Sequence, residues 1–88
     1  STENEDNMEL RASVKINEGN FDDWKVFYDS YQIVRHRYVS EESVKKITSN
    51  EAFVEFNVTD LDGLTELSAS QFVQDGENRL GVQVTIVE

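Results

Sequence analysis

The sequence contains no cysteine, and this absence removes several classes of protein at once. Without thiols the chain cannot form a disulfide or build a zinc or iron–sulfur site on thiolate ligands. It also has a single histidine, His36, which is too few imidazole ligands for a dedicated transition-metal site. We therefore expect neither a metal nor a cofactor.

Basic residues are also scarce. The chain has 8 lysine and arginine residues against 18 aspartate and glutamate residues, for a net charge of −10. Such a charge repels nucleic acid and anionic membrane surfaces, so neither is an expected partner. No apolar run approaches the ~20 residues that a membrane span needs. Residues 1–7 have neither the basic start nor the apolar core of a signal peptide, so we expect a disordered acidic tail and a cytoplasmic protein.

The small size of the chain favours self-association. With 88 residues it is near the low end of what folds alone, and disulfides cannot brace it. Pairing of two copies is a common way for a small domain to bury more surface. We expect one domain over residues 8–88, and a homodimer.

Alternating apolar and polar residues predict most of the strands. Residues 8–16, 51–58 and 82–87 all show the period of two that is typical of a half-buried strand. A shorter run over residues 44–47 predicts one more strand. The turn residues 48–50 would join it to the next strand as a hairpin.

Two helical regions separate these strands. The first is predicted to begin after the N-cap Asn20 and to run into the middle thirties, with apolar residues three and four apart. These residues are Trp24, Phe27, Tyr28, Tyr31 and Val34. The second region is predicted to begin after the N-cap Asp60, to break at residues 68–70 and to continue for one further turn. Asp75 and Gly76 are then predicted to form a loop turn.

The resulting order is strand, helix, strand, strand, helix, strand, which is the ferredoxin-like β-α-β-β-α-β arrangement of an α+β domain. It predicts a four-stranded antiparallel sheet with two helices on one face. The inward strand residues, including Val82, Val84 and Ile86, are expected in the core. The opposite face is polar but carries Phe53 and Val87, which suits a subunit interface or a ligand-lined surface, with plain solvent exposure as the alternative.

Several segments carry a resemblance to a known family. They are residues 20–25, residues 50–56, the helix start at residues 60–64 and the last strand up to Glu88. Over residues 8–88 the chain resembles the dimeric α/β-barrel superfamily, which includes the antibiotic-biosynthesis-monooxygenase-like proteins. The resemblance implies two sheets packed face to face in a homodimer, with the helices outside. It also implies activities such as cofactor-independent monooxygenation, heme degradation, isomerisation or lyase chemistry.

His36 and Tyr28 are the candidate catalytic residues. An imidazole can act as a general base or as an axial ligand to heme, and a tyrosine hydroxyl can orient or deprotonate a phenol. Trp24 and Tyr31 are close to Tyr28 on the predicted helix, so the three rings could line a pocket for a flat ligand. The alternatives are a surface histidine near a helix end and an aromatic stripe that belongs to the core.

Arg11 and Asn57 are further candidate ligand-binding residues, on the polar face of the predicted sheet with Ser13. An arginine fork and an asparagine donor can bind a carboxylate, or they can form contacts across a dimer interface. The acidic pairs do not suggest acid–base catalysis, and Glu41 and Glu42 are expected in a solvated loop.

The sequence has no P-loop, dinucleotide-binding glycine motif or nucleophile elbow. We therefore expect a small dimeric α/β-barrel protein that binds a small aromatic or acidic organic molecule. If it is an enzyme, its expected chemistry is cofactor-free monooxygenation or isomerisation. The alternative is a non-catalytic regulatory or protein-interaction module that uses its sheet face.

Overall fold

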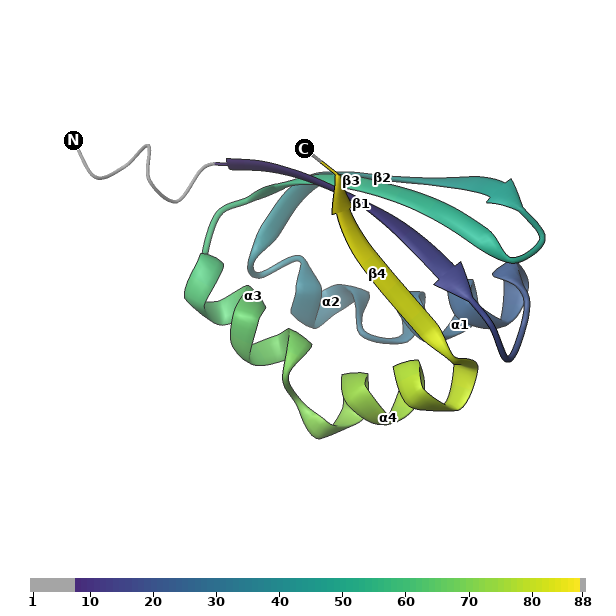
Figure 1. Cartoon of the computed structure of the whole chain (residues 1–88). Coiled ribbons are helices and arrows are strands. Elements are labelled where there is room, and N and C mark those ends of the chain that lie inside the picture. Colours follow the sequence, from purple (N-terminus) through teal and green to yellow (C-terminus); the bar gives the residue numbers. More distant parts are fainter. Residues whose placement is uncertain (1–7, 88) are drawn as a thin grey trace.

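The computed structural model describes residues 8–87, and its strands and helices follow the predicted order (Figure 1). The elements are β1 (Met8–Ile16), α1 (Phe21–Ser30), α2 (Gln32–Arg35), β2 (Val39–Thr48), β3 (Glu51–Val58), α3 (Leu61–Ser68), α4 (Gln71–Leu80) and β4 (Val82–Val87). The tail predicted over residues 1–7 lies outside the described residues. Each of the two predicted helical regions contains two helical segments.

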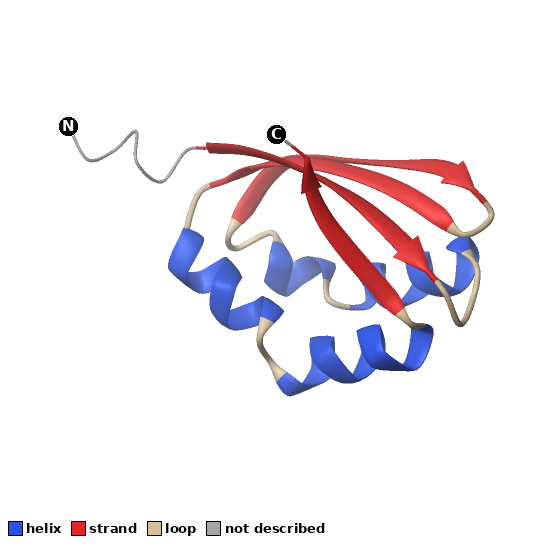
Figure 2. Ribbon diagram, viewed as in Figure 1, coloured by secondary structure: helices blue, strands red, loops and turns tan. Residues whose placement is uncertain are grey.

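The strands form one antiparallel sheet in the order β2-β3-β1-β4. The helices α1 to α4 lie on one side of this sheet, as Figures 1 and 2 show. The order and the one-sided helical layer confirm the predicted ferredoxin-like α+β fold. We call the sheet face toward the helices the helix face, and the opposite one the outer face.

The core lies between the helix face and the helices, because the strand alternation places apolar side chains there. In β3, for example, Ala52, Val54, Phe56 and Val58 are buried, whereas the residues between them are partly exposed. The register pairs Ala12 of β1 with Val54, so inward residues of neighbouring strands meet on one face. The strand predictions for β1, β3 and β4 are therefore confirmed.

Helix starts are fixed by side-chain caps, as the sequence predicts. The Asn20 side chain accepts from the Asp23 backbone N–H, and the Asp23 side chain accepts from the Asn20 backbone, which forms a capping box. Asp60 caps α3 in a similar way through the Gly63 N–H. The predicted break at residues 68–70 is confirmed, because Ser70 caps the start of α4.

The predicted turn at Asp75 and Gly76 is wrong, because both residues lie inside α4. A glycine here indicates a close approach between helices rather than a loop. A Cβ atom at position 76 would overlap the ring of Phe27, which reaches over from α1. The helix ends at Gly81, where a φ of 63° requires the left-handed conformation that glycine adopts easily.

Strand β2 is longer than predicted, because it includes residues 39–43 and Thr48 as well as 44–47, and the turn is left with residues 49 and 50. The alternation is hidden by a β-bulge, where the register shifts between Ser40 and Ser43. Glu41 has a φ of 55°, and its side chain accepts a hydrogen bond from Asn57 on the outer face. Beside the bulge, Glu42 points toward the helices, where it accepts hydrogen bonds from Tyr28 and Arg35. The prediction of a solvated loop at Glu41 and Glu42 is therefore wrong.

Three residues predicted to belong to the core are substantially exposed. Val34 is 36% exposed, because the helical region breaks at Tyr31 and its last turn does not continue the buried stripe. Val84 and Ile86 line a cavity on the helix face but are 50% and 53% exposed. They lie on β4, the edge strand, where the helices leave the sheet partly uncovered.

Candidate functional site

A cavity of about 110 Å³ lies between the helix face of the sheet and the helices. We call it the inner cavity. It is lined by Leu10, Ala12, Val14, Trp24, Tyr28, Tyr31, Arg35, Val54, Phe56, Glu77, Val84 and Ile86. The exposed halves of Val84 and Ile86 give it an apolar rim at the edge of the sheet. A cavity with apolar walls and a few polar groups is the usual form of a small-molecule site.

Three aromatic residues form one wall of the inner cavity. The rings of Trp24 and Tyr28 are stacked with their centroids 4.7 Å apart. Tyr31 meets Tyr28 edge-on, with the centroids 5.8 Å apart. These residues are at positions i, i+4 and i+7, so the helix spacing brings them to one face. The sequence prediction that these three rings share a face is confirmed. The three rings pack in or against the core, and they also line the cavity.

Arg35 and Glu42 form a buried ion pair beside this wall. The Arg35 Nε donates to Glu42 Oε2 over 2.6 Å, and Nη2 donates to Oε1 over 3.1 Å. The two side chains are only 3% and 9% exposed. The guanidinium also lies 3.5 Å above the Tyr28 ring and donates to the Tyr28 carbonyl oxygen. A bidentate, desolvated pair of this kind fixes the geometry of both side chains.

The Glu42 carboxylate also forms hydrogen bonds with two more polar side chains. The Tyr28 hydroxyl donates to its Oε2 over 2.6 Å, and His36 Nε2 lies 2.8 Å from its Oε1. Burial by itself would raise the pKa of Glu42, but hydrogen bonds from Arg35, Tyr28 and His36 outweigh burial and lower it to about 2. Glu42 is therefore ionised at neutral pH. Hydrogen bonds connect Tyr28, which lines the cavity, with His36, whose side chain is 40% exposed.

The tyrosine hydroxyls resist ionisation in this environment. Burial raises the pKa of Tyr28 well above its ordinary value, although the charge of Arg35 opposes this, and donation to Glu42 raises it further. Burial likewise raises the pKa of Tyr31 to about 12, against the charge of Arg35. Both residues are therefore protonated at neutral pH and can serve as hydrogen-bond donors.

The structure divides the six predicted site residues into two groups. Trp24, Tyr28 and Tyr31 line the inner cavity, and His36 reaches this group through Glu42. Arg11 and Asn57 are on the outer face and are not among the cavity residues. Asn57 donates to Glu41, and Arg11 is opposite Glu55 and Val87 in the sheet register.

Three residues at or beside the inner cavity were not identified as site candidates from the sequence. In the sequence Arg35 resembles an ordinary cation at a helix end, and Glu42 was expected in a loop, so neither was a site candidate. Glu77 was hidden by the incorrect turn at Asp75 and Gly76. Had a helix been predicted there, Val73, Glu77 and Leu80 would have fallen on one face at spacings of four and three. A carboxylate on an otherwise apolar helix face is the signal that could have identified Glu77.

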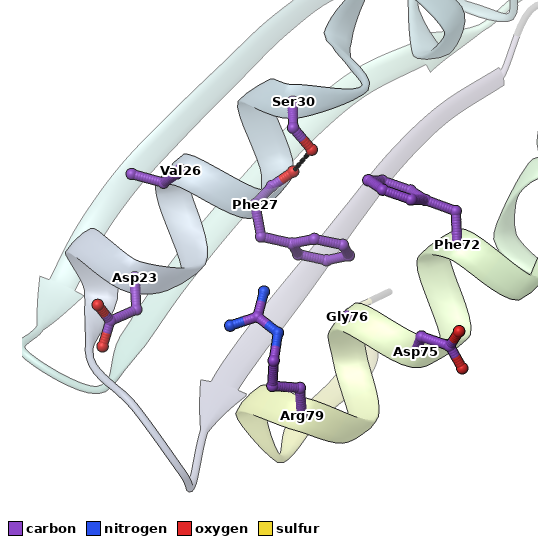
Figure 3. Close-up of a pocket in the computed structure, with 8 residues that line it drawn as sticks. All are labelled: Asp23, Val26, Phe27, Ser30, Phe72, Asp75, Gly76 and Arg79. Atoms are coloured by element: carbon purple, nitrogen blue, oxygen red, sulfur yellow. Dashed lines mark hydrogen bonds between the residues drawn. The ribbon is translucent and has the colours of Figure 1, made fainter.

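A second, larger groove of about 530 Å³ lies outside the helical layer, between α1 and α4 (Figure 3). The Phe27 and Phe72 rings contact each other there, with centroids 5.9 Å apart, and Asp23, Asp75 and Arg79 surround them. We call it the outer groove. Although the groove is larger, it is not lined by Glu42 or by the residues that hydrogen-bond to Glu42. Val26 on its rim is 73% exposed. The inner cavity is therefore the better candidate site.

Neither a metal cluster nor a membrane span is found in the described part of the chain. Within residues 8–87 no three His, Cys, Asp or Glu residues come together in a way that could hold a metal ion. Over the same residues no helix is long and apolar enough to cross a membrane.

No protein-family model and no curated protein matches this sequence. Solved structures do match it. SnoaB, a cofactor-independent oxygenase from Streptomyces nogalater, superimposes with a TM-score of 0.63 at 10% identity, over 94% of this chain and 92% of that one. NE2512, a Nitrosomonas europaea protein of unknown function, gives a TM-score of 0.61 at 12% identity, over 93% and 87%.

A third structure, from Caulobacter crescentus, has the provisional name antibiotic biosynthesis monooxygenase. Its TM-score is 0.61 at 5% identity, over 93% of this chain and 90% of that one. Identities this low show a common fold and nothing finer. The chain therefore has the ferredoxin-like fold of the antibiotic-biosynthesis-monooxygenase-like proteins. The resemblance inferred from the sequence is confirmed at the level of the fold.

Proposed function

We propose that this protein binds a small aromatic molecule in the inner cavity. The observation that carries the proposal is an aromatic wall, formed by Trp24, Tyr28 and Tyr31, beside a cavity with few polar groups. Flat rings stack well on such walls, and each aromatic contact contributes about 0.5–1.5 kcal/mol beyond area burial. The volume of about 110 Å³ with an open rim suits a single ring, since an engineered cavity of about 150 Å³ is known to take up benzene.

As its reaction we propose cofactor-free monooxygenation, with dioxygen as the oxidant, or isomerisation; both begin when a proton leaves the substrate. Tyr28 and His36 are the proposed proton-moving residues. Tyr28 lines the inner cavity, and its hydroxyl donates to Glu42 over 2.6 Å. The hydroxyl oxygen would take a proton from a ligand while it passes its own proton to Glu42. His36 lies on the other side of Glu42 and is partly exposed to solvent. A proton taken from a ligand would thus have a hydrogen-bonded route to the surface.

The binding proposal can be tested by thermal unfolding in the presence of phenol, benzyl alcohol or benzoate. A ligand at one hundred times its Kd stabilises the fold by about 2.7 kcal/mol, which raises the Tm by about 10 °C or more. We expect at least one of these compounds to raise the Tm of the wild-type protein. Val84→Trp, which fills the rim of the inner cavity, should abolish this shift.

Val26→Trp is the matched control, because it places the same bulky side chain in the outer groove. It should leave the shift unchanged. A shift that survives Val84→Trp but is lost with Val26→Trp would move the site to the outer groove. If no compound shifts the Tm, the alternative gains support: a non-catalytic module that presents its sheet face to another protein.

We also propose that the outer face pairs with a second copy of the chain. This face combines exposed polar residues such as Arg11 with Phe53, which is only partly exposed, and Val87, which is 36% exposed. Light scattering should give twice the chain mass over about a hundredfold range of concentration. Phe53→Glu should yield the monomer mass, whereas Val26→Glu on the helical side should remain a dimer. A wild-type monomer throughout would disprove this pairing.

A further inference from the structure

Glu77 is a carboxylate on the side of α4 that faces the sheet. Its helical neighbours Val73 and Leu80, four residues before and three after it, are both buried. Glu77 itself is half-buried and lines the inner cavity together with Trp24 and Tyr31. Charged residues on helices normally face solvent, so a glutamate on the apolar face needs an explanation.

No described residue compensates the charge of Glu77. None of the hydrogen bonds or ion pairs found among residues 8–87 includes its side chain. Burial raises the pKa of Glu77, which is the effect of a half-buried carboxylate without a cationic partner. Glu77 is only half-buried, so water still reaches it, but no ion pair within residues 8–87 includes it, and a cationic ligand in the cavity could pair with it.

Arg35 is not available to pair with Glu77, although it is the one basic residue among those that line the cavity. Its guanidinium is already held in two hydrogen bonds to Glu42, at 2.6 and 3.1 Å. The charges of Arg35 and Glu42 offset each other, and the charge of Glu77 remains. The inner cavity is therefore a site with aromatic walls and one net negative charge.

We propose that the ligand of the inner cavity is a protonated arylalkyl amine with a single ring, such as benzylamine, with its ammonium group bound by Glu77. This inference rests on the proposed function and specifies its ligand class. The ring would lie against Trp24 and Tyr31, whose faces also attract cations. The net charge of −10 raises the local concentration of cations around the protein and repels aromatic acids.

Three probes of nearly equal size test the proposal: benzylamine, benzyl alcohol and benzoate, compared by calorimetry at neutral pH. The wild-type protein should bind benzylamine at least about tenfold more tightly than benzyl alcohol, and benzoate more weakly still. Glu77→Gln should weaken benzylamine about tenfold and leave benzyl alcohol within about twofold. Asp75→Asn, which removes the same charge from α4 on the outer-groove side, should change none of the three affinities.

Each result decides a different question. If benzyl alcohol binds as tightly as benzylamine, or benzoate binds best, the amine proposal is wrong and the aromatic cavity stands. The same conclusion follows if Glu77→Gln retains the preference for benzylamine. If none of the probes binds the wild-type protein, both the proposed function and this inference fail. The wild-type comparison tests the preference for a cationic ligand without any variant, and Glu77→Gln then tests whether Glu77 is its source.

Discussion

Glu42→Gln is expected to lower the free energy of unfolding by about 3 kcal/mol at neutral pH. The substitution keeps the shape of the side chain but leaves the Arg35 guanidinium, 3% exposed, without a counter-charge. The lowered pKa of Glu42, about 2 against an ordinary 4.5, leads to a similar figure. Urea unfolding of both proteins measures the difference. Glu41→Gln is the matched control: its carboxylate is exposed, and we expect a change within about 0.5 kcal/mol.

The effect of Glu42→Gln should also depend on pH, with a sign that follows from linkage. Because the folded-state pKa is depressed, the contribution of Glu42 is complete above pH 4.5 and is lost as the pH falls toward about 2. The stability difference between wild type and Glu42→Gln should therefore shrink across this window. A difference that stays constant from neutral pH to about pH 2 would show that ionised Glu42 does not stabilise the fold.

Gly76→Ala is expected to destabilise the protein by about 2 kcal/mol, although alanine is the better helix former. Helix propensity alone would favour alanine by about 1 kcal/mol. However, the added methyl group would overlap the Phe27 ring, which packs directly on Gly76 between α1 and α4 (Figure 3). Overpacking of a close contact costs about 1–3 kcal/mol and forces the helices apart. Thermal or urea unfolding measures the net change.

Two comparisons isolate the cause of this loss. Asn78→Ala, at an exposed position of the same helix, should be neutral or slightly stabilising. Phe27→Leu should be less harmful in the Gly76→Ala background than in the wild type, because the smaller side chain makes room for the methyl group. If Gly76→Ala stabilises the protein, the close approach of the two helices is incorrect.

Much of the fold could be predicted because its signals are local. The period-two alternation of β1, β3 and β4 depends only on neighbouring residues, and so do the caps Asn20 and Asp60. Together they determine the order of the elements. That order leaves few topologies for a small antiparallel sheet.

The errors occur where distant parts of the chain decide the local structure. From the sequence alone Gly76 resembles a loop residue, because its role depends on the Phe27 ring of α1, which packs against it. Residues 39–43 have no regular alternation, because the bulge at Glu41 interrupts it, and only pairing with β3 makes them a strand. The buried role of Glu42 depends on that bulge and on Arg35, seven residues earlier.

The sequence by itself determined the element order, the ferredoxin-like fold and the aromatic stripe of Trp24, Tyr28 and Tyr31. These features follow from periodicity and capping, which act over one or two turns of chain. Only the tertiary structure decided that the stripe borders a cavity, that Arg35 and Glu42 neutralise each other, and that Glu77 is left without a partner. The physical reason is that burial and charge compensation depend on which groups face each other across layers, and helix or strand periodicity does not record this.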